Sequence, residues 1–421
     1  MKRILFLLLL TYSFTVISQS LTKRVLFLGN SYTNRNNLPN LLVNVSLSTG
    51  DSVFVESNTP GGYTLQGHST NSTSLNRIAQ GNWDYVVLQE QSQRPSFPDA
   101  QVQANVYPYA KRLDSLINLA NPCTETVFYM TWGRKNGDAG NCPFFPPLCT
   151  YQGMDSLLNL RYSYMANIND ALVSPVGAVW NYIRSTYPNI ELYTADESHP
   201  SQAGSYAAAC TFYATILRKD PTLITFNASL PTLEAVQIKS AVKLMVYDSL
   251  ANWNVGKYDP SAAFTTTQNV FKFDFRSDSS SLVHHFWNFG DGITDTVPNP
   301  SHTYSALGMY TVSHVVTKCN RIDSTNEVIS ILHLGNSDTD KLTNVIKVFP
   351  NPVKDILTID SEFPIFNFRL IAPNGKVVLN QPILEKSKTF SLNVQGVVSG
   401  FYYLELIGSD NHCLTRKIII E

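Results

Sequence analysis

The chain has 421 residues, more than one hydrophobic core usually supports, and 43% of them are hydrophobic. This composition excludes a wholly disordered protein and favours two or three folded domains. Charged residues make up only 15%, the formal net charge is -1, and no long basic run is present. We therefore expect no nucleic-acid partner.

The first predicted element is a secretory signal peptide over residues 1–18. Lys2 and Arg3 precede an apolar run, and Val16-Ile17-Ser18 offers a small-residue cleavage site. The alternative is a membrane anchor, but the run is short and is interrupted by Thr and Ser. No later segment has about 18 consecutive apolar residues, so we expect no membrane span in the mature chain.

Residues 22–256 alternate short apolar runs with helix-like patterns. The runs predict strands at 24–28, 53–56, 85–88, 126–132 and 171–176. The longer patterns predict helices at 38–47, 99–120, 204–217 and 233–251, and Pro108 can kink the second of these. Such alternation is typical of an α/β fold, in which helices cover both faces of a parallel sheet.

Gly29-Asn30-Ser31 directly follows the first predicted strand, and Ser31 is a candidate nucleophile at the sheet edge where parallel sheets bind ligands. The alternative is that Ser31 only caps the next helix. A nucleophilic serine needs a base, and this segment contains only His68 and His199. Asp196 precedes His199 by three residues and could accept its imidazole N–H, unless the two simply lie in a surface loop. His68 more readily positions a helix or lines the cleft.

Oxyanion donors are expected at the ends of the next two strands. Gly61-Gly62 follows the second strand, where a glycine N–H can approach a substrate closely, although an ordinary turn would also use this pair. Gln89-Glu90-Gln91-Ser92 follows the third strand and offers side-chain amides, or is a surface polar cluster. No third metal ligand accompanies the histidines, so we expect neither a metal nor another cofactor.

The order strand-Ser, strand-Gly, strand-amide and late Asp-x-x-His resembles the SGNH (GDSL-like) hydrolases over about residues 22–256. The resemblance implies a flavodoxin-like three-layer α/β/α sandwich that hydrolyses esters or transfers acyl groups. It also implies that Ser31 is the nucleophile, His199 the base and Asp196 its orienting partner. The N–H groups of Ser31 and Gly62 would form the oxyanion hole.

The third block departs from the family, which normally has Gly-x-Asn-Asp where this chain reads LQEQS. Sialate-O-acetylesterase-like relatives are similar in carrying Gln-Gly-Glu at this place. On that analogy Gln89 replaces the asparagine as the third oxyanion donor. Gln91 is the second candidate.

Substrate contacts are expected near the strand ends. Tyr32, Trp132 and Arg134, together with Trp83 and Gln91, could line a sugar platform, although large aromatic residues also commonly pack in a core. The segment 133–150 is long enough to be a substrate-shaping insertion. We expect Cys142 to pair with Cys149 inside it.

The other cysteines fit an oxidising compartment but not a disulfide scaffold. Cys123 and Cys210 are the next candidate pair. Cys319 and Cys413 fall alone in the later segments, where they read as buried small residues.

Residues 261–334 lack helical periodicity and contain WNFGDG, then PSHTY and GMYTV, at residues 287–292, 300–304 and 308–312. This closely resembles a PKD domain, an immunoglobulin-like β-sandwich that acts as a spacer or binds glycans or proteins. Residues 335–344 are polar and predict a linker.

Residues 345–421 contain VFPNPVKDILTI from residue 348, then APNGKVV and SGFYYLEL, and end in RKIIIE. They resemble the C-terminal sorting domain of the type IX secretion system, which implies a Bacteroidetes-type cell and the secretion machinery as a partner. The alternative is another β-sandwich adhesin module.

These elements together predict a secreted or cell-surface serine esterase that removes an O-acetyl or other acyl group from a carbohydrate. A catalytically silent carbohydrate- or surface-binding protein on the same fold remains open, as does an acyltransferase. The sequence does not separate hydrolysis from transfer, because the two differ only in the acceptor.

Overall fold

The computed structural model describes residues 22–331 and 346–421, apart from 270, 280–282, 320, 362–364, 374, 384–388 and 409–412. The predicted signal peptide and the predicted linker lie outside the described residues. The described residues divide into two compact units, one within 22–259 and 318–321, and the other within 260–317 and 322–421. No helix among the described residues is long and apolar enough to cross a membrane.

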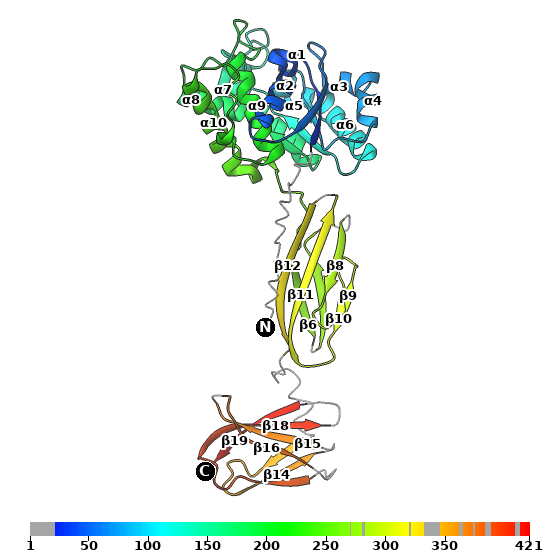
Figure 1. The fold of residues 1–421 in the computed structure, drawn as a ribbon, viewed down its shortest axis with the longest axis vertical. Helices are drawn as coiled ribbons and strands as arrows, with labels where there is room; N and C mark the ends of the chain where they lie inside the picture. The colour runs from blue at the N-terminus through cyan, green and yellow to red at the C-terminus, as the bar shows by residue number, and fades with distance from the viewer. Residues whose placement is uncertain are drawn as a thin grey trace, which may run out of the picture. The chain divides into compact units, whose positions relative to one another are not determined.

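The first unit is built on a parallel sheet with strand order β2-β1-β3-β4-β5. Figure 1 labels the helices that surround this sheet. The strands are β1 (Lys23–Leu28), β2 (Val53–Asn58), β3 (Tyr85–Leu88), β4 (Glu125–Tyr129) and β5 (Leu172–Ser174). This is the flavodoxin-like order, in which ligands bind outside the carboxyl ends of the strands. The predicted parallel α/β sheet is therefore confirmed.

Alternate residues of each strand feed two separate cores, as expected when both faces of a sheet are covered. In β1, Val25 and Phe27 pack on one face, whereas Leu26 and Leu28 pack on the other. The first face is covered by α2 (Leu38–Leu47), α8 (Val176–Thr186), α9 (Gln202–Leu217) and α10 (Thr232–Met245). The second is covered by α4 (Ser72–Ala79), α5 (Asp99–Asn105), α6 (Tyr107–Ala120) and α7 (Tyr151–Ile168). The result is the expected three-layer α/β/α sandwich.

The helix predicted over 99–120 is in fact two helices. Pro108 lies in the first turn of α6, where its missing N–H costs no hydrogen bond, and Val106 between α5 and α6 has a non-helical backbone (φ -122°, ψ -61°). The hydrophobic pattern of the sequence did not predict α7 and α8. The helix predicted over 38–47 has these bounds in the structure, as α2.

The later segments are antiparallel β-sandwiches. Residues 264–331 form sheets β10-β7-β6 and β12-β11-β8-β9, with Trp287 and Phe289 buried between them. The strands are β6 (Phe264–Asn269), β7 (Lys272–Ser277), β8 (His284–Asn288), β9 (Thr294–Asp295), β10 (Ser301–Thr303), β11 (Gly308–Lys318) and β12 (Arg321–Ile331).

Residues 346–421 form sheets β13-β14-β17 and β16-β15-β18-β19 around a second aliphatic core. The strands are β13 (Ile346–Phe349), β14 (Ile356–Ser361), β15 (Ile365–Ile371), β16 (Val377–Pro382), β17 (Thr389–Asn393), β18 (Gly400–Gly408) and β19 (Cys413–Ile420).

The disulfides correct one sequence-based pairing. Cys142 and Cys149 are bonded, as expected. Cys123, however, pairs with Cys319 across 196 residues, and Cys210 is a free thiol buried in α9. Cys210 is fully buried within the core cluster that covers the first face of the sheet. The side chain of Cys413 lies outside those described.

Candidate active site

Ser31 is the first residue of α1 (Ser31–Asn34), three residues beyond the carboxyl end of β1. The helix cap is Asn30, whose Oδ1 accepts a hydrogen bond from the N–H of Tyr32 at 3.1 Å. Ser31 is therefore not the capping residue, and its hydroxyl is free for another partner. That partner lies 168 residues away along the chain.

Ser31 Oγ lies 2.9 Å from His199 Nε2, and His199 Nδ1 lies 2.6 Å from Asp196 Oδ2. Both distances are within hydrogen-bonding reach. The structure thus brings together the serine, histidine and aspartate that the sequence selected. We call these three residues the Ser31 trio.

Asp196 is held by its own loop, which follows α8 and precedes α9. Its Oδ1 accepts from the N–H groups of Ser198 and His199 at 3.0 and 2.9 Å, and from the Thr194 hydroxyl at 2.9 Å. Partial burial acts to raise the pKa of Asp196, but these bonds and the imidazole contact hold it well below the usual range. The carboxylate therefore stays ionised and can orient the imidazole.

Tyr32 and Trp132 do not form the expected sugar platform, because their exposed fractions are only 2% and 0%. Instead they stack on each other with ring centroids 4.9 Å apart, and both contact the loop that carries His199. The Tyr32 hydroxyl lies 2.5 Å from Ser198 Oγ, and Trp132 Nε1 donates to Ser198 O at 3.1 Å. Trp83 is also buried, packed against Phe54.

Gln89 is fully buried, and its amide is already used. Nε2 donates to Asn30 Oδ1 at 2.9 Å and to Glu90 O at 2.6 Å. Oε1 accepts from the N–H of Asn30 and from the Thr33 hydroxyl, at 3.0 and 2.8 Å. Both amide hydrogens are donated within the protein, so assigning Gln89 as an oxyanion donor is wrong for this arrangement. Gln89 instead fixes the loop that precedes Ser31.

Gly29 is glycine because of this packing. A Cβ there would lie 2.7 Å from Gln89 Oε1 and 2.5 Å from Thr33 Oγ1. The loop after β1 can therefore close on Gln89 only when residue 29 has no side chain.

Gly62, Gln91 and Arg134 keep atoms available for a ligand. Gly62 is exposed, has φ +66°, and has open space where a Cβ would be. Gln91 accepts from the N–H of Gln93 at 2.9 Å through Oε1, and its Nε2 donates one hydrogen to Gln93 Oε1 at 3.0 Å. The Arg134 side chain is 31% exposed, and its NH1 nitrogen lies 3.2 Å from Asp138 Oδ1.

His68 has a structural position. Its Nε2 lies 2.9 Å from Gly29 O, and its Nδ1 lies 2.8 Å from Ser74 Oγ. Burial lowers the pKa of His68 to about 4, outweighing the opposing effect of the Gly29 carbonyl. A neutral His68 therefore links α3 (Leu65–His68) to the loop before Ser31, in agreement with the positioning role expected for it.

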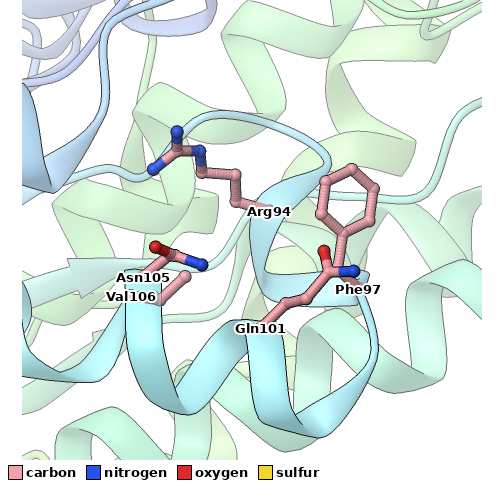
Figure 2. A pocket seen from close by; sticks show the side chains of 5 residues that line it. All are labelled: Arg94, Phe97, Gln101, Asn105 and Val106. Atoms are coloured by element: carbon pink, nitrogen blue, oxygen red, sulfur yellow. The ribbon is translucent and has the colours of Figure 1, made fainter.

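A surface hollow of about 190 Å³ lies beside the loop after β3. Figure 2 shows its lining residues, Arg94, Phe97, Gln101, Asn105 and Val106. None of them belongs to the Ser31 trio, so the hollow does not define the reacting centre.

Two segments match family models. Residues 257–330 match a PKD domain, and residues 347–421 match a secretion system C-terminal sorting domain. Both resemblances stated from the sequence are therefore confirmed. The sorting domain shows that the protein is secreted or held at the cell surface, and it implies an interaction with the type IX secretion machinery.

Similar solved structures include a DUF4886 family protein from Bacteroides uniformis, with 16% identity, a TM-score of 0.46, and coverage of 55% of this chain and 95% of that one. A candidate SGNH hydrolase from Slackia heliotrinireducens has 28% identity, a TM-score of 0.37, and coverage of 46% and 99%. Collagenase ColA from Bacillus cereus is 30% identical over 100 residues, 23% of this chain. The chain spans about a tenth of the length of the curated relatives it matches.

Proposed function

We propose that the first unit is a serine ester hydrolase of the SGNH type, acting outside the cell. The observation that carries the proposal is the continuous pair of hydrogen bonds through the Ser31 trio, 2.9 Å from serine to imidazole and 2.6 Å from imidazole to carboxylate. A serine hydroxyl is a weak nucleophile unless an adjacent base removes its proton. His199 is placed to do so.

In the first half of the reaction, His199 Nε2 takes the Ser31 proton while Oγ attacks the ester carbonyl. The imidazolium that forms is stabilised by Asp196, which stays ionised because of its hydrogen bonds. The tetrahedral intermediate then collapses, and His199 returns the proton to the leaving alcohol oxygen. The products of this half are the free alcohol and an acyl group on Ser31 Oγ.

The negative charge on the tetrahedral oxygen needs donors that are free before the reaction. We assign the N–H groups of Ser31 and Gly62 to this task. With Gln89 engaged elsewhere, the second amide hydrogen of Gln91 becomes the third donor that we propose. Deacylation repeats the sequence with water in place of the alcohol and releases the acid.

The substrate that we propose is an acyl ester of a carbohydrate, on the resemblance noted from the sequence. The burial of Tyr32 and Trp132 removes the aromatic surface that this proposal invoked. Arg134, partly exposed on the segment after β4, remains as a polar contact. Transfer to a second alcohol instead of water would use the same trio, so the acceptor decides between hydrolase and acyltransferase.

The test is turnover of p-nitrophenyl acetate by the full chain, with Ser31→Ala and His199→Ala. Ser185→Ala and His284→Ala are the matched controls, since both side chains are exposed and lie outside the trio. We expect turnover in the wild type and both controls, and its loss in the trio variants. Full activity in the Ser31→Ala variant would contradict the proposal.

A further inference from the structure

Three loops meet at the carboxyl edge of the sheet, after β1, β2 and β3, and buried side chains join them in pairs. Asn30 Nδ2, on the first loop, donates to Tyr63 O on the second at 2.9 Å. Gln89 Nε2, on the third, donates to Asn30 Oδ1 at 2.9 Å. These bonds connect the first loop to the second and to the third. The connection between the second and third loops is made by another residue.

Glu90 supplies the connection between the second and third loops. Its Oε2 accepts from the N–H of Leu65 at 3.2 Å, and its Oε1 accepts from its neighbour Gln91 at 2.6 Å. Leu65 begins α3, three residues after Gly62. One carboxyl group therefore joins the segment that carries Gly62 to the segment that carries Gln91.

A carboxyl group at this place is costly. Glu90 is fully buried, and it takes part in no ion pair found among the described residues. Burying a charge without a cation is unfavourable unless hydrogen bonds compensate. A neutral glutamine has nearly the same shape, but its amide nitrogen would face one of the two N–H groups. Only a carboxylate presents an acceptor to both.

We infer that Glu90 is a positioning residue that sets the spacing between the Gly62 and Gln91 donors of the oxyanion hole. The inference rests on the proposed function, because the Gly62 and Gln91 donors belong to the oxyanion hole proposed there. Glu90 itself is assigned no contact with substrate. A displacement of a donor by about 1 Å can cost about 100-fold in rate, so a side chain that fixes the gap between two donors matters for turnover.

The proton on Glu90 should then affect the rate. Burial raises the pKa of Glu90 to about 7, against the lowering effects of the Gln91 and Leu65 N–H groups and of Arg94. The groups facing it from neighbouring elements are Arg94 and the Tyr162 hydroxyl, which accepts from the Glu90 N–H at 3.3 Å. Burial keeps the pKa of Tyr162 above its ordinary value. Glu90 is thus the group in this set that changes charge near neutral pH.

Protonation turns one carboxyl oxygen into a donor facing an N–H group, so the connection loosens as pH falls through about 7. Protonation of Glu90 therefore adds a fall in turnover on the acid side of the wild type. The Glu90→Gln variant lacks this step.

The experiment measures kcat and KM of the full chain across pH for the wild type, Glu90→Gln and Asp114→Asn. Asp114 is the matched control, a buried carboxyl on α6 that accepts from Thr126 Oγ1 at 2.7 Å, away from the trio. We expect Glu90→Gln to lower kcat about 10- to 100-fold with KM little changed, and Asp114→Asn to change neither. The ratio of wild-type to Glu90→Gln kcat should shrink as pH falls through about 7, because the wild-type carboxylate then takes up a proton.

Equal kinetics of Glu90→Gln and Asp114→Asn, at matched circular dichroism, would overturn the inference. If Glu90→Gln does not fold, Glu90→Asp decides, since the shorter carboxylate cannot keep its bonds to both the Leu65 and Gln91 N–H groups. A lower kcat in Glu90→Asp supports the inference, and wild-type kcat contradicts it. A folded wild type with no turnover and no labelling of Ser31 by a phosphonate would overturn the proposed function, and this inference with it. An active wild type with a Glu90-independent rate would overturn only the inference.

Discussion

The Tyr32 hydroxyl lies 2.5 Å from Ser198 Oγ, which joins the residue after the candidate nucleophile to the residue before the candidate base. Tyr32 shares α1 with Ser31, and Ser198 shares a loop with His199. The contact therefore links the two segments that must keep Ser31 Oγ and His199 Nε2 within reach. The packing of Tyr32 in the core therefore helps to set the distance between Ser31 and His199.

Removing the Tyr32 hydroxyl should slow turnover clearly and lower the free energy of unfolding only slightly. We expect Tyr32→Phe to reduce kcat about 10-fold, because the loop that carries His199 loses its link to α1. The free energy of unfolding should fall by about 1 kcal/mol, the usual net value of one hydrogen bond. Tyr206→Phe is the control, since its hydroxyl donates to Phe226 O at 2.8 Å within the core. If both variants lose equal stability and neither loses activity, Tyr32 has only a packing role.

Replacing Asp196 should remove most of the activity without unfolding the unit. In Asp196→Asn the amide would favour the wrong imidazole tautomer, and we expect kcat to fall about 10³- to 10⁴-fold. Glu197→Gln is the neighbouring control, since the exposed Glu197 carboxylate only accepts from Asn136 Nδ2 at 2.9 Å. Steady-state kinetics and thermal unfolding of both variants check the prediction. Activity within a few-fold of wild type in Asp196→Asn would contradict the role of the aspartate.

The two glutamines after β3 should respond differently to the same substitution. Gln89→Glu places a carboxylate oxygen against Asn30 Oδ1 and Glu90 O, so we expect a loss of about 2–4 kcal/mol in the free energy of unfolding. Gln91→Glu keeps the oxygen that accepts from Gln93 but loses the amide donor. It should lower kcat about 10²- to 10³-fold while the melting temperature changes little.

Chemical denaturation and kinetics on the same preparations separate these effects. Gln91→Glu with wild-type turnover would remove Gln91 from the oxyanion hole. Gln89→Glu with wild-type stability would mean that the buried amide network does not hold as described.

Glu90 should also make stability depend on pH in an unusual direction. Its folded-state pKa is raised to about 7, whereas an unfolded glutamate titrates near about 4.3. The folded state therefore binds more protons between these values, and the contribution of Glu90 is fully present below about 4.3 and is lost as pH rises through about 7. We expect the wild type to lose roughly 2–4 kcal/mol relative to Glu90→Gln between pH 4.5 and pH 8. Parallel stability curves for the two proteins would show that Glu90 titrates normally.

Local sequence patterns were enough to locate the strands and the residues at their carboxyl ends. Apolar runs place Ser31 and Gly62 on one edge of the sheet, because the ends of parallel strands meet there. His199 followed from a different argument, since the segment offers only one other histidine. These inferences depend on chain order and residue type, which the sequence states directly.

The roles of Gln89, Tyr32 and Trp132 were misassigned for a common reason. Each is a polar or aromatic side chain whose role depends on its partners in space. The Gln89 amide hydrogens are donated to Asn30 and to a neighbouring carbonyl, and nothing in LQEQS says so. The pairing of Cys123 with Cys319 has the same origin, because it joins positions 196 residues apart. The isolated glycine of GNS was the one available signal, since a glycine there indicates close approach of another group.

The most direct test of the account is covalent labelling of Ser31 by a serine-directed phosphonate, followed by peptide mass spectrometry of the full chain. The arrangement predicts one modified peptide containing Ser31, no modification in Ser31→Ala, and slower labelling in His199→Ala, because the imidazole increases the nucleophilicity of Oγ. A folded wild-type protein that remains unlabelled at Ser31 under conditions that label a known serine esterase would contradict the central claim.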